Sequence, residues 1–479
     1  MSESEDTMGT GSRADAPQQT SRSIGTVIVA MALIEALSGI TQGYVNPLLP
    51  ALGPVLSIND ATINGIFLLS QLGFAVLTPV ISKFGDSWGY RPVLRANIVL
   101  VTVGVVLMAV HPRLWTVMIG VVLLSSVVGF IPLMLGIVRL AGPRHTRTGV
   151  SAMIAVLMAT VGLGGLLAGL VGRHTPTHGF WVAVPFAVIA LVLVRLVPDV
   201  GAGTHEPVAV VPLLACSLGL IGSVTAISMG SDWGWTDPRT LAPGVGGLLL
   251  LAVWARRDFT RQHTFVDLSM FRLSQVRVVS GATFFFGFAS ISYISTNALF
   301  LFSHSEEAGY GFGLSSLQIA SLFLVVSATS FVASLLTTRL MRRAGERPTL
   351  SGSGLVLCGA FVTMAVLHRS LPGYCVGLAL FGIGLGLYQA STRALSVEGV
   401  APGLTATAAG INELALSIGI AVGAAVVKLL SSAFLSDGHI TSRGLVAIWT
   451  TLAAGALIAS LIGLRYVRPT AADPDEVIA

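Results

Sequence analysis

The chain has 479 residues, of which 53% are hydrophobic and only 10% are charged. Soluble globular proteins carry about 25% charged residues, so this composition excludes a soluble fold and indicates a protein built for the lipid bilayer. The net charge of +5 does not indicate nucleic-acid binding, because an excess of arginine in a membrane protein mostly marks the loops that stay in the cytoplasm.

Apolar runs near the length of a membrane-spanning helix, about 20 residues, recur along almost the whole sequence. Residues 1–23 are polar and contain no apolar signal-peptide core, so we predict a disordered cytoplasmic tail there. About fourteen transmembrane helices follow. The predicted spans are 24–48, 61–82, 93–111, 115–140, 148–172, 180–197, 208–229, 240–255, 278–303, 315–338, 348–367, 372–394, 404–432 and 444–466.

A short charged turn occurs twice. The stretch DSWGYRPVL at 86–94 returns in altered form as RRAGERPTL at 342–350, with Gly, Arg, Pro and Leu at the same offsets. Internal repeats of this kind are common in secondary transporters, whose two halves rock against each other. We therefore predict an all-α integral membrane fold with two six-helix bundles and two additional central helices. The predicted units are the bundles 24–198 and 276–468, the extra helices with a basic cytoplasmic linker at 199–275, and a cytoplasmic tail at 469–479.

The arginines orient the predicted helices. With the N-terminus in the cytoplasm, the even-to-odd loops hold most arginines, including Arg91, Arg139, Arg147 and Arg347. This bias satisfies the positive-inside rule with both termini cytoplasmic. The basic, amphipathic segment 256–277 is expected to lie along the cytoplasmic membrane surface.

Several stretches carry a family resemblance. The loop after the second span keeps Asp86, Gly89 and Arg91 of the pattern G-x-L-x-D-R-x-G-R-R, and with it the chain resembles the major facilitator superfamily, specifically its fourteen-span drug:proton antiporter (DHA2) branch. Four further stretches match this branch in the same order along the chain: FWVAVP at 180–185, WGWTDP at 233–238, VDLSMFR at 266–272 and FGIGLGL at 381–387. The resemblance implies a multidrug exporter of the cell membrane that confers antibiotic resistance. The richness in Ala, Val, Gly and Arg over Lys suggests a bacterial source.

The repeated turns have a physical interpretation as a conformational latch. Gly89 and Gly345 allow a tight turn between helices, and Arg91 and Arg347 follow them two residues later. Asp86 is able to face a helix N-terminus or an arginine, a contact that breaks when the bundles separate. The alternative is that these charges only hold the loops in the cytosol.

The fifth span contains a glycine-rich segment that resembles the antiporter motif, although Gly165 takes the place of the motif's proline. Glycines let helix backbones approach closely, as a sliding interface requires. Ordinary tight packing explains the same residues. The glycines concerned are Gly162, Gly164, Gly165 and Gly169.

Two acidic residues lie inside predicted spans. Glu35 is halfway through the first span and Glu413 lies within the thirteenth. A carboxylate at the bilayer centre costs about 2.5–3.5 kcal/mol on insertion scales, so both are candidates for proton coupling. Thr41 occupies the position of the family's late span-1 acid, and the span-4 arginine is missing near Gly120. Glu35 is then a substitute acid, or else the chain is not an antiporter. A further alternative is that Glu35 is permanently neutral and hydrogen-bonded to a neighbouring helix.

Further polar residues are expected to line a substrate cavity together with Met and Phe side chains. They lie in the first, second, ninth, twelfth and thirteenth spans. The candidates are Gln42, Tyr44, Asn46, Gln71, Tyr293, Asn297, Tyr388, Gln389 and Asn412.

Enzymatic motifs are not supported. Residues 85–89 match the nucleophile elbow G-x-S-x-G, but that motif needs a strand before it, and here it follows a membrane helix. A P-loop needs Gly-Lys-Ser/Thr, and neither Lys83 nor Lys428 follows a glycine. No H-E-x-x-H zinc motif occurs. We expect no catalytic residues, no cofactor and no metal.

We therefore expect a monomeric secondary transporter that exports drug-like or amphipathic molecules by proton antiport with alternating access. The expected partners are a small-molecule substrate, protons and the bilayer, and not nucleic acid. One alternative is a dedicated exporter or importer of a single metabolite, with or without proton coupling. Another is a non-transporting membrane sensor.

Overall fold

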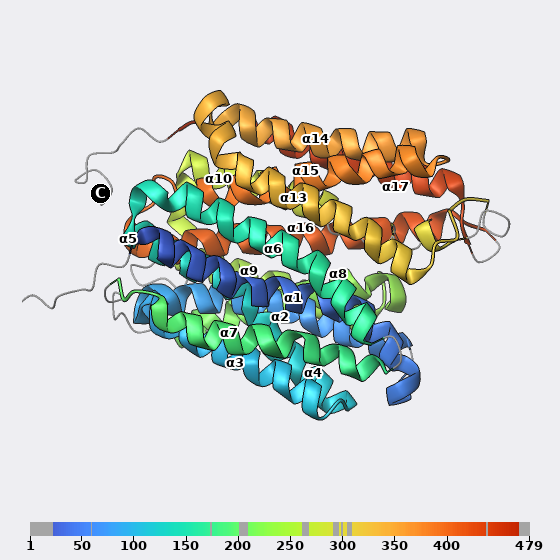
Figure 1. Ribbon diagram of the computed structural model, residues 1–479, viewed down its shortest axis with the longest axis horizontal. Coiled ribbons are helices and arrows are strands. Elements are labelled where there is room, and N and C mark those ends of the chain that lie inside the picture. The colour runs from blue at the N-terminus through green and yellow to red at the C-terminus, as the bar shows by residue number, and fades with distance from the viewer. Residues whose placement is uncertain are drawn as a thin grey trace, which may run out of the picture.

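The computed structural model describes residues 23–58, 60–172, 175–200, 209–260, 268–290, 297, 300–303, 309–436 and 439–468. Long helices run side by side along the longest axis of the molecule (Figure 1). Twelve helices in this described part of the chain are long and apolar enough to cross a membrane. The protein is therefore an all-α, multi-pass membrane protein, apart from one short β-hairpin.

The first half of the bundle begins with α1, which packs along α6, while α3 packs against α4 and α7. The predicted span 115–140 is broken, because a 3₁₀ stretch separates α4 from α5. Such stretches often mark a hinge or a strained sequence. The elements are α1 Ile24–Leu56, α2 Asp60–Trp88, α3 Tyr90–Val110, α4 Leu114–Leu124, η1 Ser125–Gly129, α5 Phe130–Ala141, η2 Pro143–His145, α6 Thr146–Val171, η3 Pro176–Ala183, α7 Val184–Leu193 and η4 Val194–Leu196.

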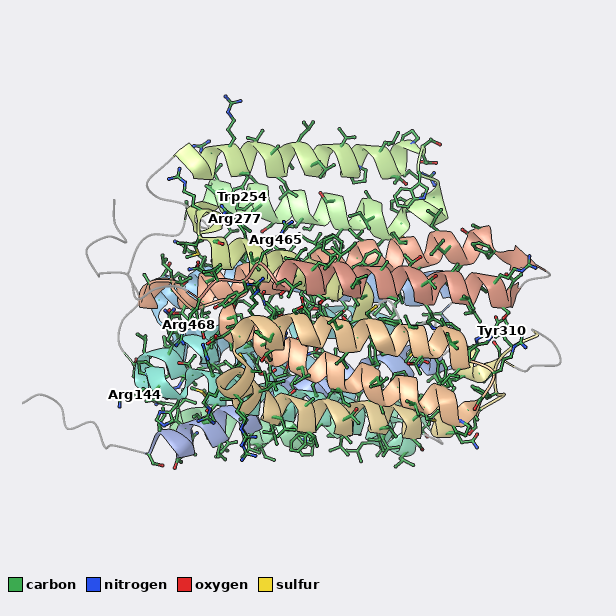
Figure 2. The ribbon with its side chains drawn as sticks, turned by 90° about the horizontal axis from the view of Figure 1, so that it is seen from above. Arg144, Trp254, Arg277, Tyr310, Arg465 and Arg468 are labelled. Carbon is green, nitrogen blue, oxygen red and sulfur yellow. The ribbon has the colours of Figure 1, made fainter. Side chains whose placement is uncertain are left out.

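The helices α8 (Val210–Trp233) and α9 (Pro238–Thr260), which correspond to the two predicted additional spans, lie at one side of the molecule. Figure 2 shows these two green helices at its upper edge. α8 packs against α9 on one side and against both α2 and α16 on the other. It therefore covers a seam where the two halves of the bundle meet.

The second half repeats the antiparallel packing, with α14 against α15 and α17, and α10 against α16 and α17. A two-stranded antiparallel hairpin pairs Leu435 with Ile440 and Ser436 with His439. The elements are η5 Leu268–Arg272, α10 Ser274–Ser290, α13 Ser316–Ala344, α14 Glu346–Leu367, α15 Leu371–Leu395, η6 Pro402–Leu404, α16 Thr405–Ala433, β1 Leu435–Ser436, β2 His439–Ile440 and α17 Ser442–Gly463.

The repeated turns have the same backbone geometry in both halves. Gly89 separates α2 from α3 with φ +92°, and Gly345 separates α13 from α14 with φ +93°. Residues with a Cβ rarely adopt this conformation, so glycine permits the sharp reversal. Both turns lie at the end of the bundle where Figure 2 labels Arg144 and Arg468, opposite Tyr310. We call it the arginine-rich end.

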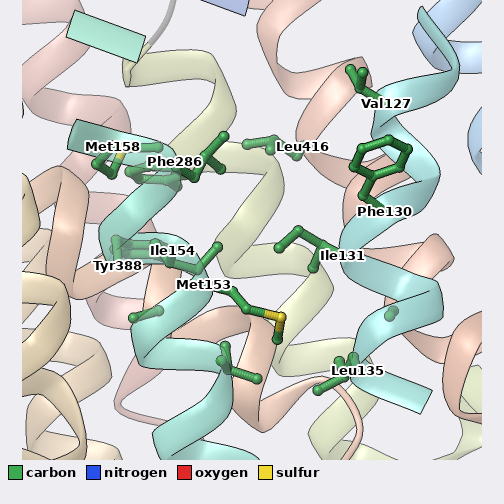
Figure 3. Packing of buried hydrophobic residues seen from close by; sticks show 14 of the residues in the cluster. Val127, Phe130, Ile131, Leu135, Met153, Ile154, Met158, Phe286, Tyr388 and Leu416 are labelled. Carbon is green, nitrogen blue, oxygen red and sulfur yellow. The ribbon is translucent and has the colours of Figure 1, made fainter. Parts of the chain in front are cut away.

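The two halves meet along α6 and α13 and along α2, α5 and α16. Figure 3 shows apolar side chains between them, including Ile131 from α5, Met153 from α6 and Leu416 from α16. Gly162 brings α6 close to α13, because a Cβ there would stand 2.1 Å from Ser327 Oγ and 2.7 Å from its Cβ. The two halves are therefore in tight contact at this point.

The other predicted glycines of α6 differ in their surroundings. A Cβ on Gly164 would stand 2.7 Å from the Ile40 carbonyl oxygen of α1, and one on Gly165 would stand 3.4 Å from the Gly43 carbonyl oxygen. A Cβ on Gly169 would meet nothing within 4 Å. The glycine-rich segment thus packs mainly on its own half through α1, and contacts the other half through Gly162.

The twelve helices of membrane-spanning length correspond to twelve of the fourteen predicted spans. The remaining two predicted spans fall on α2, some of whose side chains lie outside the described residues, and on the segment that begins with α10, whose predicted span 278–303 includes residues outside the described ranges. The count of fourteen stays a prediction. The predicted surface linker 256–277 is divided, because α9 continues to Thr260 and α10 begins at Ser274.

Replacing Gly162 by Ala should destabilise the protein by about 1–3 kcal/mol, because overpacking forces α6 and α13 apart. Thermal unfolding in detergent measures the loss, and Gly169→Ala is the matched control with open space around it. Ser327→Gly, which removes the clashing Cβ, should restore part of the lost stability. Equal effects of the two alanine variants would contradict the packing argument.

Candidate functional site

A cavity of about 250 Å³ lies between the two halves. The first half contributes side chains from α1, α2, α4, η1, α5 and α6, and the second half contributes side chains from α15 and α16. Its wall is apolar over wide stretches, as at Phe74, Met158 and Ile420, with polar groups in between. The polar side chains are Glu35, Ser38, Thr41, Gln42, Ser70, Ser125, Gln389, Arg393, Glu413 and Ser417.

Glu35 lies on the cavity side of α1 and is only 1% exposed. Its side chain is hydrogen-bonded to Ser38, three residues further along the helix. Gln42 in turn donates from Nε2 to Ser38 Oγ at 2.9 Å. The spacing of three and four residues places these groups on one helix face. Glu35 Oε2 has no hydrogen-bond partner among the residues that the structure describes.

Arg393 and Glu413 form an ion pair on the opposite wall of the cavity. Arg393 Nε lies 2.7 Å from Glu413 Oε1, and Arg393 Nη2 donates to Oε2 at 2.9 Å. The two residues are 6% and 5% exposed. The Nε contact lacks hydrogen-bond geometry, so the pair combines one charge-assisted hydrogen bond with one close ionic contact. Arg393 is on α15 and Glu413 on α16, so the pair joins two helices of the second half.

Four of the predicted cavity residues are not on the cavity wall. Tyr44 packs edge-on against Phe180, and Tyr388 stacks on Phe286 with ring centroids 4.3 Å apart. Asn412 accepts a hydrogen bond from Thr283, while Asn297 accepts one from Tyr374. In each case the partner lies in the same half, so these groups contribute to the packing of that half.

Four other predicted residues line the cavity: Gln42, Gln389, Glu35 and Glu413. Tyr293 and the side chains of Asn46 and Gln71 lie outside the described residues. Thr41, which replaces the family's acid, also faces the cavity but donates to backbone carbonyls of its own helix.

Asp86 contacts the N-terminus of α16 in the other half. Its carboxylate accepts hydrogen bonds from the backbone N–H of Ala406 at 3.3 Å and of Thr407 at 2.8 Å, and also from the Thr407 hydroxyl. Tyr90 donates to the same carboxylate at 2.7 Å. A helix N-terminus favours negative charge. Of the two partners that the sequence allowed, Asp86 faces a helix N-terminus.

Arg147 forms a second contact between the halves at the arginine-rich end. Its Nη2 lies 2.6 Å from Glu346 Oε1, and its Nε lies 2.7 Å from Glu398 Oε1. Arg139 adds hydrogen bonds to Thr405 and to the Val400 carbonyl. The charged contacts described between the halves thus gather at this end.

The other predicted latch residues take different places. Arg91 lies 3.9 Å from Asp199 of its own half, and Arg347 is exposed. Glu346, the residue between Gly345 and Arg347, carries the contact instead.

Three important arginines were missed as site residues, because Arg139, Arg147 and Arg393 look like ordinary positive charges at span ends. One signal pointed to Arg393: it follows Gln389 by four residues and so shares its helix face. The acceptors Glu398 and Val400 are distant in sequence from Arg147 and Arg139, and no local pattern connects them.

The fold has two helical halves with a cavity between them whose wall is partly apolar and partly polar. This arrangement is typical of transporters that bind a small molecule between their halves. The chain belongs to the Major Facilitator Superfamily, because the sequence profile of that family matches residues 31–424 and 279–476. The protein is therefore a membrane transporter of small molecules and not an enzyme.

Relatives and solved structures agree with this assignment. The lincomycin resistance protein LmrB of Listeria monocytogenes is 23% identical over 446 residues, which cover 91% of this chain and 93% of that protein. The multidrug resistance protein B homolog of Mycobacterium tuberculosis is 25% identical over 371 residues, 75% of this chain and 67% of that protein. The human organic anion transporter MFSD10 (TETRAN) has the same fold, with a TM-score of 0.66, 18% identity, and coverage of 92% of this chain and 100% of that one.

A double-mutant cycle tests the contact between Arg147 and Glu398. The coupling energy between Arg147→Ala and Glu398→Ala should be about 0.5–3 kcal/mol, the range for residues in direct contact. Unfolding in detergent measures it. Arg144→Ala combined with Glu398→Ala is the control, because Arg144 is exposed, and it should give a coupling close to zero. A coupling near zero for both pairs would contradict the contact.

Proposed function

We propose that the protein exports drug-like or amphipathic small molecules from the cytoplasm in exchange for protons. The names of its relatives support this direction and substrate class, since two of them are described as lincomycin and multidrug resistance proteins. The wall of the cavity supports it as well. Apolar surface interrupted by a few polar groups suits amphipathic ligands without demanding one particular shape.

The observation that carries the proposal is the position of Glu35. It is buried in the cavity between the halves and has no ion-pair partner among the described residues. A buried carboxyl without a cation favours its neutral form, whereas access to water favours ionisation. A protein that opens this cavity first to one side and then to the other therefore loads and unloads a proton at Glu35.

The contacts at the arginine-rich end support alternating access. We assign this end to the cytoplasm on the distribution of arginines. Asp86 and Arg147 then close the cytoplasmic side in the present conformation, because both join the first half to the second. Opening that side requires these charged contacts to break, and they serve as the latch of the transport cycle.

We assign α2 and the segment that begins with α10 as the two remaining spans, which gives fourteen. With this count both termini lie in the cytoplasm, and α8 and α9 are the two extra helices of the drug:proton antiporter branch. The position of α8 against both halves supports the division into 24–198, 199–275 and 276–468.

The second candidate function is transport of one dedicated metabolite. The cavity volume of about 250 Å³ favours it, because ligand pockets usually measure about 300–1,000 Å³ and a broad exporter needs room. Growth of a drug-sensitive host that produces the protein separates the two functions. Resistance to many compounds supports the multidrug exporter, and resistance to one compound supports the dedicated transporter.

Replacing Glu35 by Gln should abolish efflux driven by a pH gradient, because the amide cannot carry a proton, while probe binding should remain. Reconstituted vesicles with an imposed pH gradient and ethidium or lincomycin as the probe measure the loss. Glu35→Asp, which keeps the carboxyl group, is the control and should retain part of the activity. Undiminished pH-driven efflux by Glu35→Gln would contradict the coupling role.

A further inference from the structure

The cavity holds three ionisable side chains whose surroundings differ. Glu35 faces the cavity from α1 in the first half, and Arg393 and Glu413 face it from α15 and α16 in the second half. Among the described residues, Arg393 and Glu413 are the charged groups that act on Glu35 from the elements across the cavity. Both carboxyl groups were candidates for proton coupling, and the structure distinguishes them.

Glu413 already has its counter-charge. Arg393 Nη2 donates to Glu413 Oε2 at 2.9 Å, and Arg393 Nε lies 2.7 Å from Oε1 as a close ionic contact. An arginine does not lose its proton in a protein, so the guanidinium remains a fixed positive charge. A fixed positive charge at this distance favours the ionised form of its partner. With Glu413 ionised, the pair is neutral overall.

Glu35 is left without such a partner. Its described hydrogen bond comes from Ser38, and its Oε2 meets no partner among the described groups. With the other two charges balanced, ionised Glu35 would leave one uncompensated negative charge in the buried cavity. A proton removes that charge.

We infer that Arg393 is a positioning residue for proton transfer: by keeping Glu413 ionised, it leaves Glu35 as the carboxyl group that takes up and releases the transported proton. This rests on the proposed proton-coupled function. One proton binds the Glu35 carboxylate from one side of the membrane and leaves from the other side. Arg393 is thus the positive charge on the described cavity wall, and it comes from the second half. The fourth predicted span contributes uncharged side chains to that wall.

The same pair also connects the cavity to the latch. Arg393 lies in the last turn of α15, five residues before Glu398, which binds Arg147. Glu413 lies six residues after Thr407, which binds Asp86. The Arg393–Glu413 pair therefore links the last turn of α15 to α16, and both helices lead directly to residues that contact the first half.

Infrared difference spectroscopy after a pH change tests the inference on the full-length protein in lipid, without any substrate. A protonated buried carboxyl group gives a carbonyl-stretch band of its own. We expect one such band in the wild type, its loss in Glu35→Gln and its retention in Glu413→Gln. Arg393→Gln should add a second band, which Arg393→Gln combined with Glu413→Gln removes again.

A merely structural ion pair gives a different pattern. In that case Arg393→Gln lowers the unfolding temperature without adding a band, which would overturn the inference, as would loss of the wild-type band in Glu413→Gln. Arg393→Lys keeps the positive charge and should retain the single band. It is the control that keeps the test valid where the glutamine variant misfolds. If the bands behave as expected but vesicles show no pH-driven efflux, the proton-coupled function fails while the assignment of the titrating carboxyl group stands.

Discussion

The free-energy cost of burying an unpaired charge is the main constraint on the cavity between the two halves of this protein. The helices bring two carboxyl groups and one guanidinium into a single cavity. A buried ionised group there needs a partner of opposite charge, and a carboxylate without one is stabilised by protonation. Arg393 and Glu413 form an ion pair within the second half, whereas Glu35 has a hydrogen bond to Ser38 and no ion-pair partner among the described residues. We propose that this asymmetry leaves Glu35 as the carboxyl group that responds to the side of the membrane the cavity faces.

The helices that surround the cavity also carry the contacts that close one end of the molecule. α16 begins at Thr405, where its free N–H groups meet Asp86, and reaches the cavity two turns later at Glu413. α6 begins beside Arg147 and passes Gly162, where it lies closest to α13. Because stiff helices connect these points, a change of charge in the cavity and a separation of the halves at the arginine-rich end involve the same rigid elements.

Local sequence patterns predicted the features that depend on local chemistry. Apolar run lengths located the helices, the repeated turns predicted the glycines with positive φ, and Glu35 was visible as an acid inside an apolar span. Pairings between distant residues had no such signal. Arg393 resembles a topology charge at a span end, and only the packing of α15 against the cavity places it beside Glu413. Likewise the sequence predicted Asn412 as a cavity residue, whereas its side chain accepts a hydrogen bond from Thr283.

Distances between spin labels at the two ends of the molecule test alternating access most directly. One label pair replaces Arg144 and Arg343 at the arginine-rich end, and the other replaces Val55 and Arg369 at the opposite end; all four residues are exposed. In lipid vesicles shifted between acidic and alkaline pH, the two distances should change in opposite directions as the halves rock. Two distances that stay constant, or that lengthen and shorten together, would contradict the account.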